Sequence, residues 1–172
     1  MRTLTILPVP GKEAERFESS LCFFPLAGAV IGLLVWLAAW SVGALLKWPL
    51  GAGVACVALS TIVTGGLHLD GLADVFDSMG GRTRERKLEI MKDPRIGSFG
   101  VAALVLCLLV KFAAVVRLAE AGHYAVLVLP CVVSRTMQVP FAVWLPYARA
   151  DGTALSFVEC AKPVHFLASL LL

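Results

Sequence analysis

Charged residues are scarce in this chain, and those present are clustered. Of the 172 residues, 16% are charged and 59% are hydrophobic. Soluble domains usually carry about 25% charged residues. The shortage of charge, and the long stretches without any, therefore argue against a water-soluble protein and favour one that lies in a membrane.

The chain also lacks a cleavable signal pattern and paired cysteines. Prolines and glutamates occupy residues 1–20, ahead of the first apolar run. A signal peptide would place an apolar core there, so we expect the first apolar run to be retained. None of the five cysteines belongs to a CxxC pair. We therefore expect neither a disulfide nor a zinc site.

Apolar runs separated by short polar segments predict an all-α fold, a polytopic bundle of transmembrane helices in one membrane-embedded domain, 1–172. A spanning helix needs about 20 apolar residues. The predicted spans lie at about 19–46, 50–68, 98–118, 124–145 and 164 onward. The last run meets the chain end, so we expect a truncated last span in the N-terminal part of a longer multi-span protein.

Local signals refine these spans. Ser98 is placed to cap the third helix, and Pro140 is expected to interrupt the fourth. The pair Gly28-x-x-x-Gly32 in the first span permits close helix packing, including self-association into a possible homo-oligomer.

The distribution of Lys and Arg predicts the orientation. Residues 78–95 contain six of them and 149–162 contain two, and the N-terminal segment adds Arg2, Lys12 and Arg16. Cytoplasmic loops are enriched in Lys and Arg. Four spans with a cytoplasmic N-terminus put every basic segment on the cytoplasmic side of the membrane, which in the family that the sequence resembles (below) is the bacterial inner membrane. Membrane lipid is an expected partner, and nucleic acid is not.

An acidic segment follows the second apolar run. Asp70, Asp74 and Asp77 are spaced i, i+4, i+7 and, on a helix, fall within an arc of roughly 60°. Carboxylates on one stripe beside a membrane repel one another and need a cation. Oxygen ligands suit Mg²⁺, especially with substrate phosphates. The alternative is a solvated helix end paired with loop arginines. His68 points roughly 160° away, which favours a packing or interfacial role over metal binding.

Basic residues follow the acidic segment. Lys92 and Arg95 flank Asp93-Pro94 in a rigid turn and could bind a phosphate, Arg95 as a bidentate fork. The competing interpretation is a basic loop on anionic lipid headgroups. Lys111 and Arg135 lie inside apolar spans, where charge is costly. Either could bind a phosphorylated substrate or pair with the aspartates.

These features together predict a membrane enzyme that handles a phosphate-containing substrate with a divalent metal at the cytoplasmic face. Phosphoryl transfer needs mainly positioning and charge neutralisation. A stripe of carboxylates near Lys and Arg side chains meets both requirements.

The sequence resembles the cobalamin synthase family, whose activity is adenosylcobinamide-GDP ribazoletransferase. Two segments carry most of the similarity: Thr64-Gly-Gly-Leu-His68-Leu-Asp70-Gly-Leu-Ala-Asp74 and Glu85-Arg-Lys-Leu-Glu-Ile-Met-Lys92-Asp93-Pro94-Arg95-Ile-Gly97. Shorter matches add Leu4–Pro10, Phe24–Gly28, Ser134–Arg135 and Pro146–Arg149. The similarity covers nearly the whole chain, and members of the family continue through further spans.

The resemblance implies a reaction and its partners. A hydroxyl of α-ribazole, or of its 5′-phosphate, attacks the phosphoryl group attached to adenosylcobinamide, and GMP leaves. The implied cofactor is Mg²⁺, held by Asp70, Asp74 and Asp77. Substrate would be bound by Lys92, Arg95, His68 and Arg135. Asp74, Asp77 or Asp93 would accept the hydroxyl proton.

Two other functions fit parts of the pattern. Gly66-x-x-x-Asp70-x-x-x-Asp74 resembles the second half of the CDP-alcohol phosphotransferase signature, whose first half is absent here. A transporter whose intramembrane charges carry ions is a third possibility, although the sequence shows no paired inverted halves. A test of which donor is consumed separates a CDP-alcohol phosphotransferase from the cobalamin reaction. Ion flux in sealed vesicles would identify a transporter.

Overall fold

The computed structural model describes residues 20–148, 152 and 154–171, and in them it is helical without strands. The predicted all-α fold is therefore confirmed. The described residues form two compact units, one containing those up to Ala38 and from His123, the other Ala39–Gly122. The basic residues predicted near the N-terminus, and Arg149, lie outside the described residues.

The first apolar run is one long helical stretch. A 3-10 turn η1 (Leu21–Phe23) leads into α2 (Phe24–Trp40), and a π-helical turn η2 (Ser41–Leu45) follows it. These 25 residues are long and apolar enough to cross a membrane. At 1.5 Å per residue they cover about 37 Å, more than the hydrocarbon core.

The fourth predicted span is a 3-10 turn η3 (Tyr124–Leu127) followed by α7 (Val128–Trp144), together long enough to cross a membrane. Pro140 is buried inside α7, and the helix continues to Trp144. The expected interruption at Pro140 is therefore wrong. Proline removes one backbone donor, and membrane helices tolerate that loss when neighbouring groups compensate.

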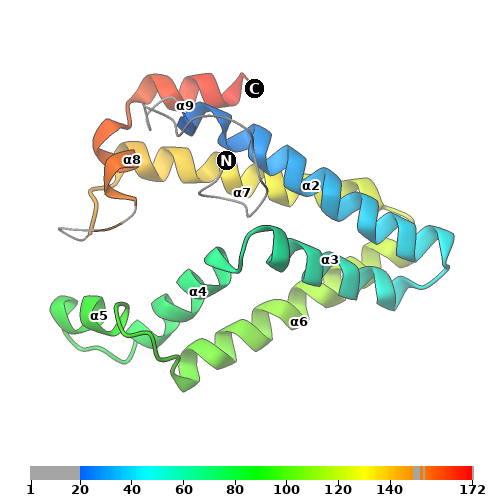
Figure 1. The fold of residues 1–172 in the computed structure, drawn as a ribbon, viewed down its shortest axis with the longest axis horizontal. Helices are drawn as coiled ribbons and strands as arrows, with labels where there is room; N and C mark the ends of the chain where they lie inside the picture. The colour runs from blue at the N-terminus through cyan, green and yellow to red at the C-terminus, as the bar shows by residue number, and fades with distance from the viewer. Residues whose placement is uncertain (1–19, 149–151, 153, 172) are drawn as a thin grey trace. The chain divides into compact units, whose positions relative to one another are not determined.

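The same unit contains two short helices, α8 (Leu155–Cys160) and α9 (Pro163–Leu170). α9 packs on α7 (Figure 1). The ring centroids of Trp144 and Phe166 lie 5.1 Å apart in an edge-on arrangement. α9 has eight residues and is not among the helices long enough to cross a membrane by itself.

Gly28 and Gly32 bring α2 close to the backbone of α7. A Cβ on Gly28 would lie 2.5 Å from the carbonyl oxygen of Cys131, and one on Gly32 would lie 3.0 Å from the Cα of Val128. The close-packing role predicted for these glycines is thus fulfilled inside the unit. The glycine pair consequently gives no support to a homo-oligomer.

Substituting Gly28 with alanine should destabilise the protein. The added methyl group meets backbone atoms of α7, so one helix must shift, and overpacking of this kind costs about 1–3 kcal/mol. We expect a lower melting temperature in detergent. The matched control is Val30→Ile, which adds one carbon on the exposed side of α2 and should melt like the wild type. Equal melting temperatures for both variants would contradict the close contact.

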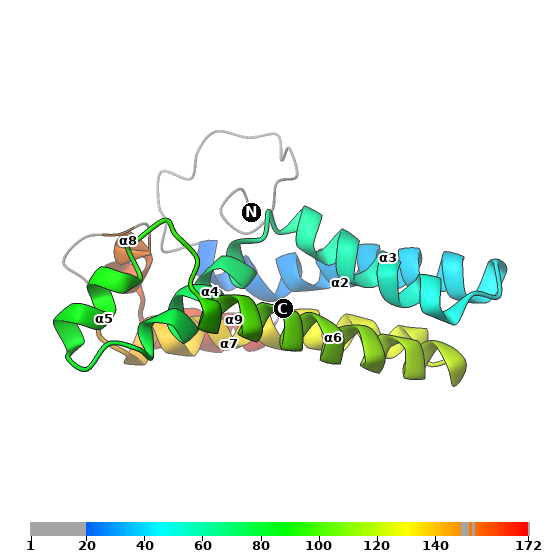
Figure 2. The same cartoon turned by 90° about the horizontal axis from the view of Figure 1, so that it is seen from below.

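In the second unit, the predicted span at 50–68 is two helices. α3 (Pro49–Val63) is followed by α4 (Leu67–Ser78), and their axes differ by 88° (Figure 2). Gly65 and Gly66 at the break have φ of 59° and 70°. Glycine adopts this left-handed backbone at little cost, so the Gly-Gly pair encodes the bend.

A short helix α5 (Arg84–Ile90) begins at Thr83, whose hydroxyl accepts a hydrogen bond from the Arg86 N–H. The long α6 (Ser98–Glu120) then packs along α3 (Figure 1). α6 begins at Ser98 with Gly97 as its N-cap, so the expected capping by Ser98 is wrong.

Among the residues that the structure describes, three stretches are therefore long and apolar enough to span a membrane, or four if the bent pair α3–α4 counts as one span. A bent pair of this kind is either a broken span or a re-entrant loop. Either way, the bend puts the acidic segment on a separate helix rather than at the end of a straight span.

Candidate active site

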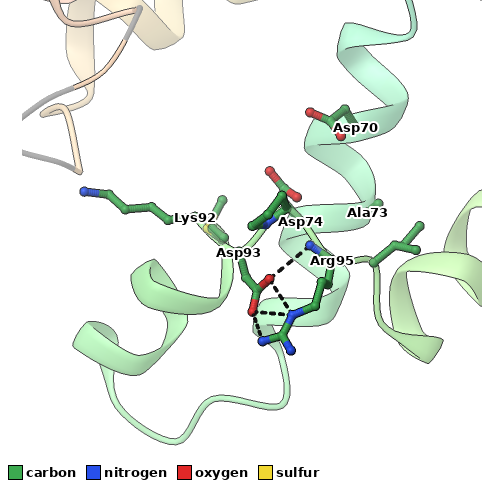
Figure 3. Close-up of a pocket in the computed structure, with 9 residues that line it drawn as sticks. Asp70, Ala73, Asp74, Lys92, Asp93 and Arg95 are labelled. Carbon is green, nitrogen blue, oxygen red and sulfur yellow. Dashed lines mark hydrogen bonds and ion pairs between the residues drawn. The ribbon is translucent and has the colours of Figure 1, made fainter.

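Asp70 and Asp74 lie one turn apart on α4 and line the same cavity. The rest of the wall is Ala73 from α4 and the turn between α5 and α6, which contributes Met91, Lys92, Asp93, Pro94, Arg95 and Ile96 (Figure 3). The structure thus brings the acidic segment of α4 face to face with the basic turn that precedes α6. The acidic segment and the basic turn belong to one site.

The cavity has a volume of about 220 Å³ and is lined by three carboxylates and two cationic side chains. Pockets for whole drug-sized ligands are usually about 300–1,000 Å³. This one is suited to a small charged group, such as a pyrophosphate with its counter-ion, rather than to a large ring system. Its mixed charge suits a metal on one wall and phosphate oxygens on the other.

Asp93 and Arg95 form an ion pair in the turn. The Arg95 Nε donates to Oδ1 at 2.9 Å and its Nη2 to Oδ2 at 2.6 Å, while its backbone N–H also donates to Oδ1 at 3.0 Å (Figure 3). These bonds lower the pKa of Asp93 to about 2, and the hydrogen bond from the Arg95 side chain contributes the most. The pairing in turn raises the pKa of Arg95. Both groups are fully charged at neutral pH.

Lys92 contributes its stem to the cavity wall. Its ammonium group extends away from Asp70 and Asp74 (Figure 3). The residue is exposed and belongs to the cavity wall, so its positive charge is a candidate partner for a bound anion. Arg95, in contrast, is already oriented by Asp93.

Asp77, the third aspartate of the predicted stripe, is bonded to α6 instead. Its Oδ2 accepts from the Gly97 N–H at 2.7 Å, and its Oδ1 accepts from the Gly100 N–H at 2.8 Å. It does not line the cavity. The three aspartates share α4 as expected, but only Asp70 and Asp74 face the cavity.

The other predicted residues lie outside the cavity wall. His68 is half-buried on α4 and does not line the cavity. Arg135 is on α7 in the other unit and is 7% exposed, and its Nη1 donates to the Ser134 hydroxyl at 3.0 Å. Its Nε is the one buried side-chain polar atom without a partner among the described residues. Lys111 donates to the Ser60 hydroxyl at 2.7 Å, which ties α6 to α3.

The cavity suits a metal that takes few protein ligands. Within the described part of the chain, no group of three or more His, Cys, Asp or Glu side chains is arranged to hold a metal ion. Mg²⁺ commonly binds through one or two carboxylates, with water and substrate phosphates completing its shell. Asp70 and Asp74 fit that pattern, whereas a closed protein-only site would need more ligands.

Two features of the site have weak sequence signals. Met91 and Ile96 line the cavity as apolar neighbours of charged residues, and although both lie within the segment that resembles the family, no charge or spacing marks them as site residues. The bonds of Asp77 to Gly97 and Gly100 could have been suspected from the helix start that follows Pro94. There, glycines occupy both positions whose side chains usually cap a helix.

Comparison with known proteins places the chain in a family. Residues 1–172 match the cobalamin-5-phosphate synthase family. The adenosylcobinamide-GDP ribazoletransferases of Chlorobaculum tepidum and Chlorobaculum parvum are 51% and 50% identical to the chain, over 97% of its length in each case and 66% of theirs. The relative of the same name from Herpetosiphon aurantiacus is 42% identical over 96% of the chain and 68% of its own length.

The chain thus spans about two thirds of the length of the curated relatives that it matches. No solved structure matches it significantly. The family match covers every residue, including the acidic segment and the basic turn that form the cavity. The chain belongs to the cobalamin-5-phosphate synthase family.

Proposed function

We propose that this protein transfers the adenosylcobinamide-phosphate group from adenosylcobinamide-GDP to α-ribazole or α-ribazole 5′-phosphate, with release of GMP. The observation that carries the proposal is the cavity in which two carboxylates of α4 face Lys92 and Arg95. Its chemistry suits a pyrophosphate, the group that this reaction cleaves. The relatives' name, adenosylcobinamide-GDP ribazoletransferase, supports the donor and the acceptor.

Asp70 and Asp74 would hold Mg²⁺, the proposed cofactor. When bound, the ion neutralises the pyrophosphate and fixes its orientation. The metal role of Asp77 in the sequence interpretation is not carried into this proposal, because both of its oxygens accept backbone hydrogen bonds.

The opposite wall would bind the leaving GMP. Arg95 is held in the turn by Asp93 and can direct the remaining edge of its guanidinium at phosphate oxygens. Lys92 adds a mobile positive charge. Phosphoryl transfer depends mainly on such positioning and charge neutralisation. His68 lies on α4 outside the cavity wall, and Arg135 belongs to the other unit, so their predicted substrate-binding roles form no part of the cavity and stay predictions.

Asp74 lines the cavity and is the proposed proton acceptor, through the carboxylate oxygen that does not hold the metal. The pKa of Asp93 is about 2, so at neutral pH its carboxylate is a weak base. Asp77 is engaged with α6. In the proposed step, the acceptor oxygen forms a bond to the phosphorus attached to adenosylcobinamide, its proton passes to Asp74, and the bond to the bridging oxygen breaks with the electron pair leaving on GMP.

The proposed location is a bacterial inner membrane with the cavity at the cytoplasmic face. The basic residues that follow α4 support this side of the membrane, because short cytoplasmic loops are rich in Lys and Arg. The exposed basic side chains of α5 would then lie near anionic lipid headgroups.

The test is GMP release by the full-length protein in detergent. Adenosylcobinamide-GDP plus α-ribazole, or its 5′-phosphate, should yield GMP with Mg²⁺ and almost none after chelation. A CDP-alcohol offered as the donor should yield no CMP. Consumption of the CDP-alcohol instead, or ion flux in sealed vesicles without any GMP, would replace the proposed reaction with one of the two competing functions.

A further inference from the structure

A single carboxylate of α4 closes the N-terminus of α6. The Asp77 oxygens accept from the N–H groups of Gly97, the N-cap residue, and Gly100, the third residue of the helix. These are the two N–H groups that a capping box satisfies from within a helix. Here one side chain, 20 residues back in the chain, satisfies both. The positive end of the α6 dipole also attracts the negatively charged carboxylate of Asp77.

Glycines at positions 97 and 100 make this close approach of the Asp77 carboxylate possible. A Cβ on Gly97 would lie 2.9 Å from the Asp77 Cγ, and one on Gly100 would lie 3.0 Å from the same atom and 3.1 Å from the Ala73 carbonyl oxygen. Only glycine therefore lets the carboxylate approach the backbone this closely. The two glycines at the capping positions leave the space that the Asp77 carboxylate needs to cap α6.

This contact joins the two walls of the cavity. On α4, Asp77 lies just after Asp74, which lines one wall. At its other end the contact holds Gly97, where the turn that carries Arg95 runs into α6. A shift of α6 relative to α4 would therefore move Arg95 relative to Asp74. The distance between the metal-binding and the phosphate-binding groups depends on this anchor.

We propose that Asp77 is a positioning residue that sets the two cavity walls at the distance needed for phosphoryl transfer. It acts through the α6 N-terminus and not as a metal ligand. The inference rests on the proposed function for its activity readout, while its structural readout is independent of any reaction.

The first test is Asp77→Asn and Asp77→Ala. The asparagine keeps one acceptor oxygen and loses the other and the charge, so kcat should fall about 10-fold, and about 100-fold for alanine, since a misplacement of roughly 1 Å can cost that much. The Mg²⁺ concentration for half-maximal activity should stay within about threefold of wild type. Asp74→Asn, in contrast, should raise it at least about 10-fold.

The second test is Gly100→Ala, which leaves Asp77 in place but blocks its approach. It should reproduce the Asp77→Ala loss, and the double variant should be no worse than either single variant, because both remove the same contact. Gly71→Ala is the matched control, since a Cβ there meets nothing within 4 Å. Additive losses in the double variant would overturn the proposal.

The third test needs no turnover. Hydrogen exchange at the amides of Gly97 and Gly100 should be at least about 10-fold faster in Asp77→Ala, while Mn²⁺ used as a Mg²⁺ substitute should bind with unchanged affinity. Loss of Mn²⁺ affinity with unchanged exchange would make Asp77 a ligand and refute its positioning role. A wild-type protein that releases no GMP but passes this test would refute only the proposed function.

Discussion

Replacing Asp74 with alanine is expected to lower GMP release at least about 1,000-fold without unfolding the protein. Asp74 lines the cavity, where it is proposed both to hold Mg²⁺ and to accept the proton. A metal that neutralises phosphate charge contributes several kcal/mol to transition-state stabilisation, and each 1.36 kcal/mol is a factor of about ten in rate. The assay is single-turnover GMP release at saturating Mg²⁺.

The folded state should survive this change, and it offers a second readout. Alanine is a stronger helix former than aspartate, so α4 should stay folded in the metal-free variant. The wild type should be stabilised by added Mg²⁺, because a ligand that binds only the native state raises its stability. Asp74→Ala should lose most of that Mg²⁺-induced shift in melting temperature.

Glu85→Ala is the control for loss of an acidic residue in the same region. Glu85 is exposed in α5 and does not line the cavity, so its removal should leave both GMP release and the Mg²⁺-induced shift unchanged. Wild-type turnover in Asp74→Ala would remove this carboxylate from the mechanism. A shift retained at full size would show that the metal binds elsewhere.

The helices and their approximate limits could be predicted because membrane segments carry a strong local signal. Apolar runs at 98–118 and 124–145 correspond to α6 and to η3 with α7 within one or two residues. The i, i+4 spacing of Asp70 and Asp74 also needed only the helical period. In each case the information is contained in a few neighbouring residues.

The bend between α3 and α4 shows where hydropathy fails. The apolar run at 50–68 reads as a single span, yet two left-handed glycines turn the chain by 88°. Hydropathy cannot distinguish a straight span from a bent one, because it ignores backbone conformation.

Contacts between helices that are distant in the sequence could not be predicted either, for a different reason. By spacing alone Asp77 is as good a candidate for a metal ligand as Asp74, and only the placement of α6 shows that each of its oxygens accepts a backbone hydrogen bond. The pair Gly28 and Gly32 likewise looked available for self-association until α7 was seen against it. A helical period specifies a face of a helix but not what covers that face.

Replacing Arg95 with alanine should lower kcat about 100- to 1,000-fold, the usual cost of removing one preorganised group that stabilises developing charge. Arg95→Lys should recover little of this loss. Asp93 holds the Nε and Nη2 edge of the guanidinium, so the geometry of the fork, and not only its charge, directs the group. Stopped-flow GMP release at saturating donor and Mg²⁺ measures both effects.

The partner variant Asp93→Asn separates orientation from charge. It leaves Arg95 charged but removes its anchor, so a smaller loss of about 10-fold is expected. The pKa of Asp93 is about 2, below the ordinary 3.8, so the ion pair is complete above about pH 4 and is lost only as the pH falls through about 2. The ratio of wild-type to Asp93→Asn rates should therefore be flat from about pH 5 to 8. A ratio that rises through this range would mean that Asp93 titrates there and acts as the base, in place of Asp74.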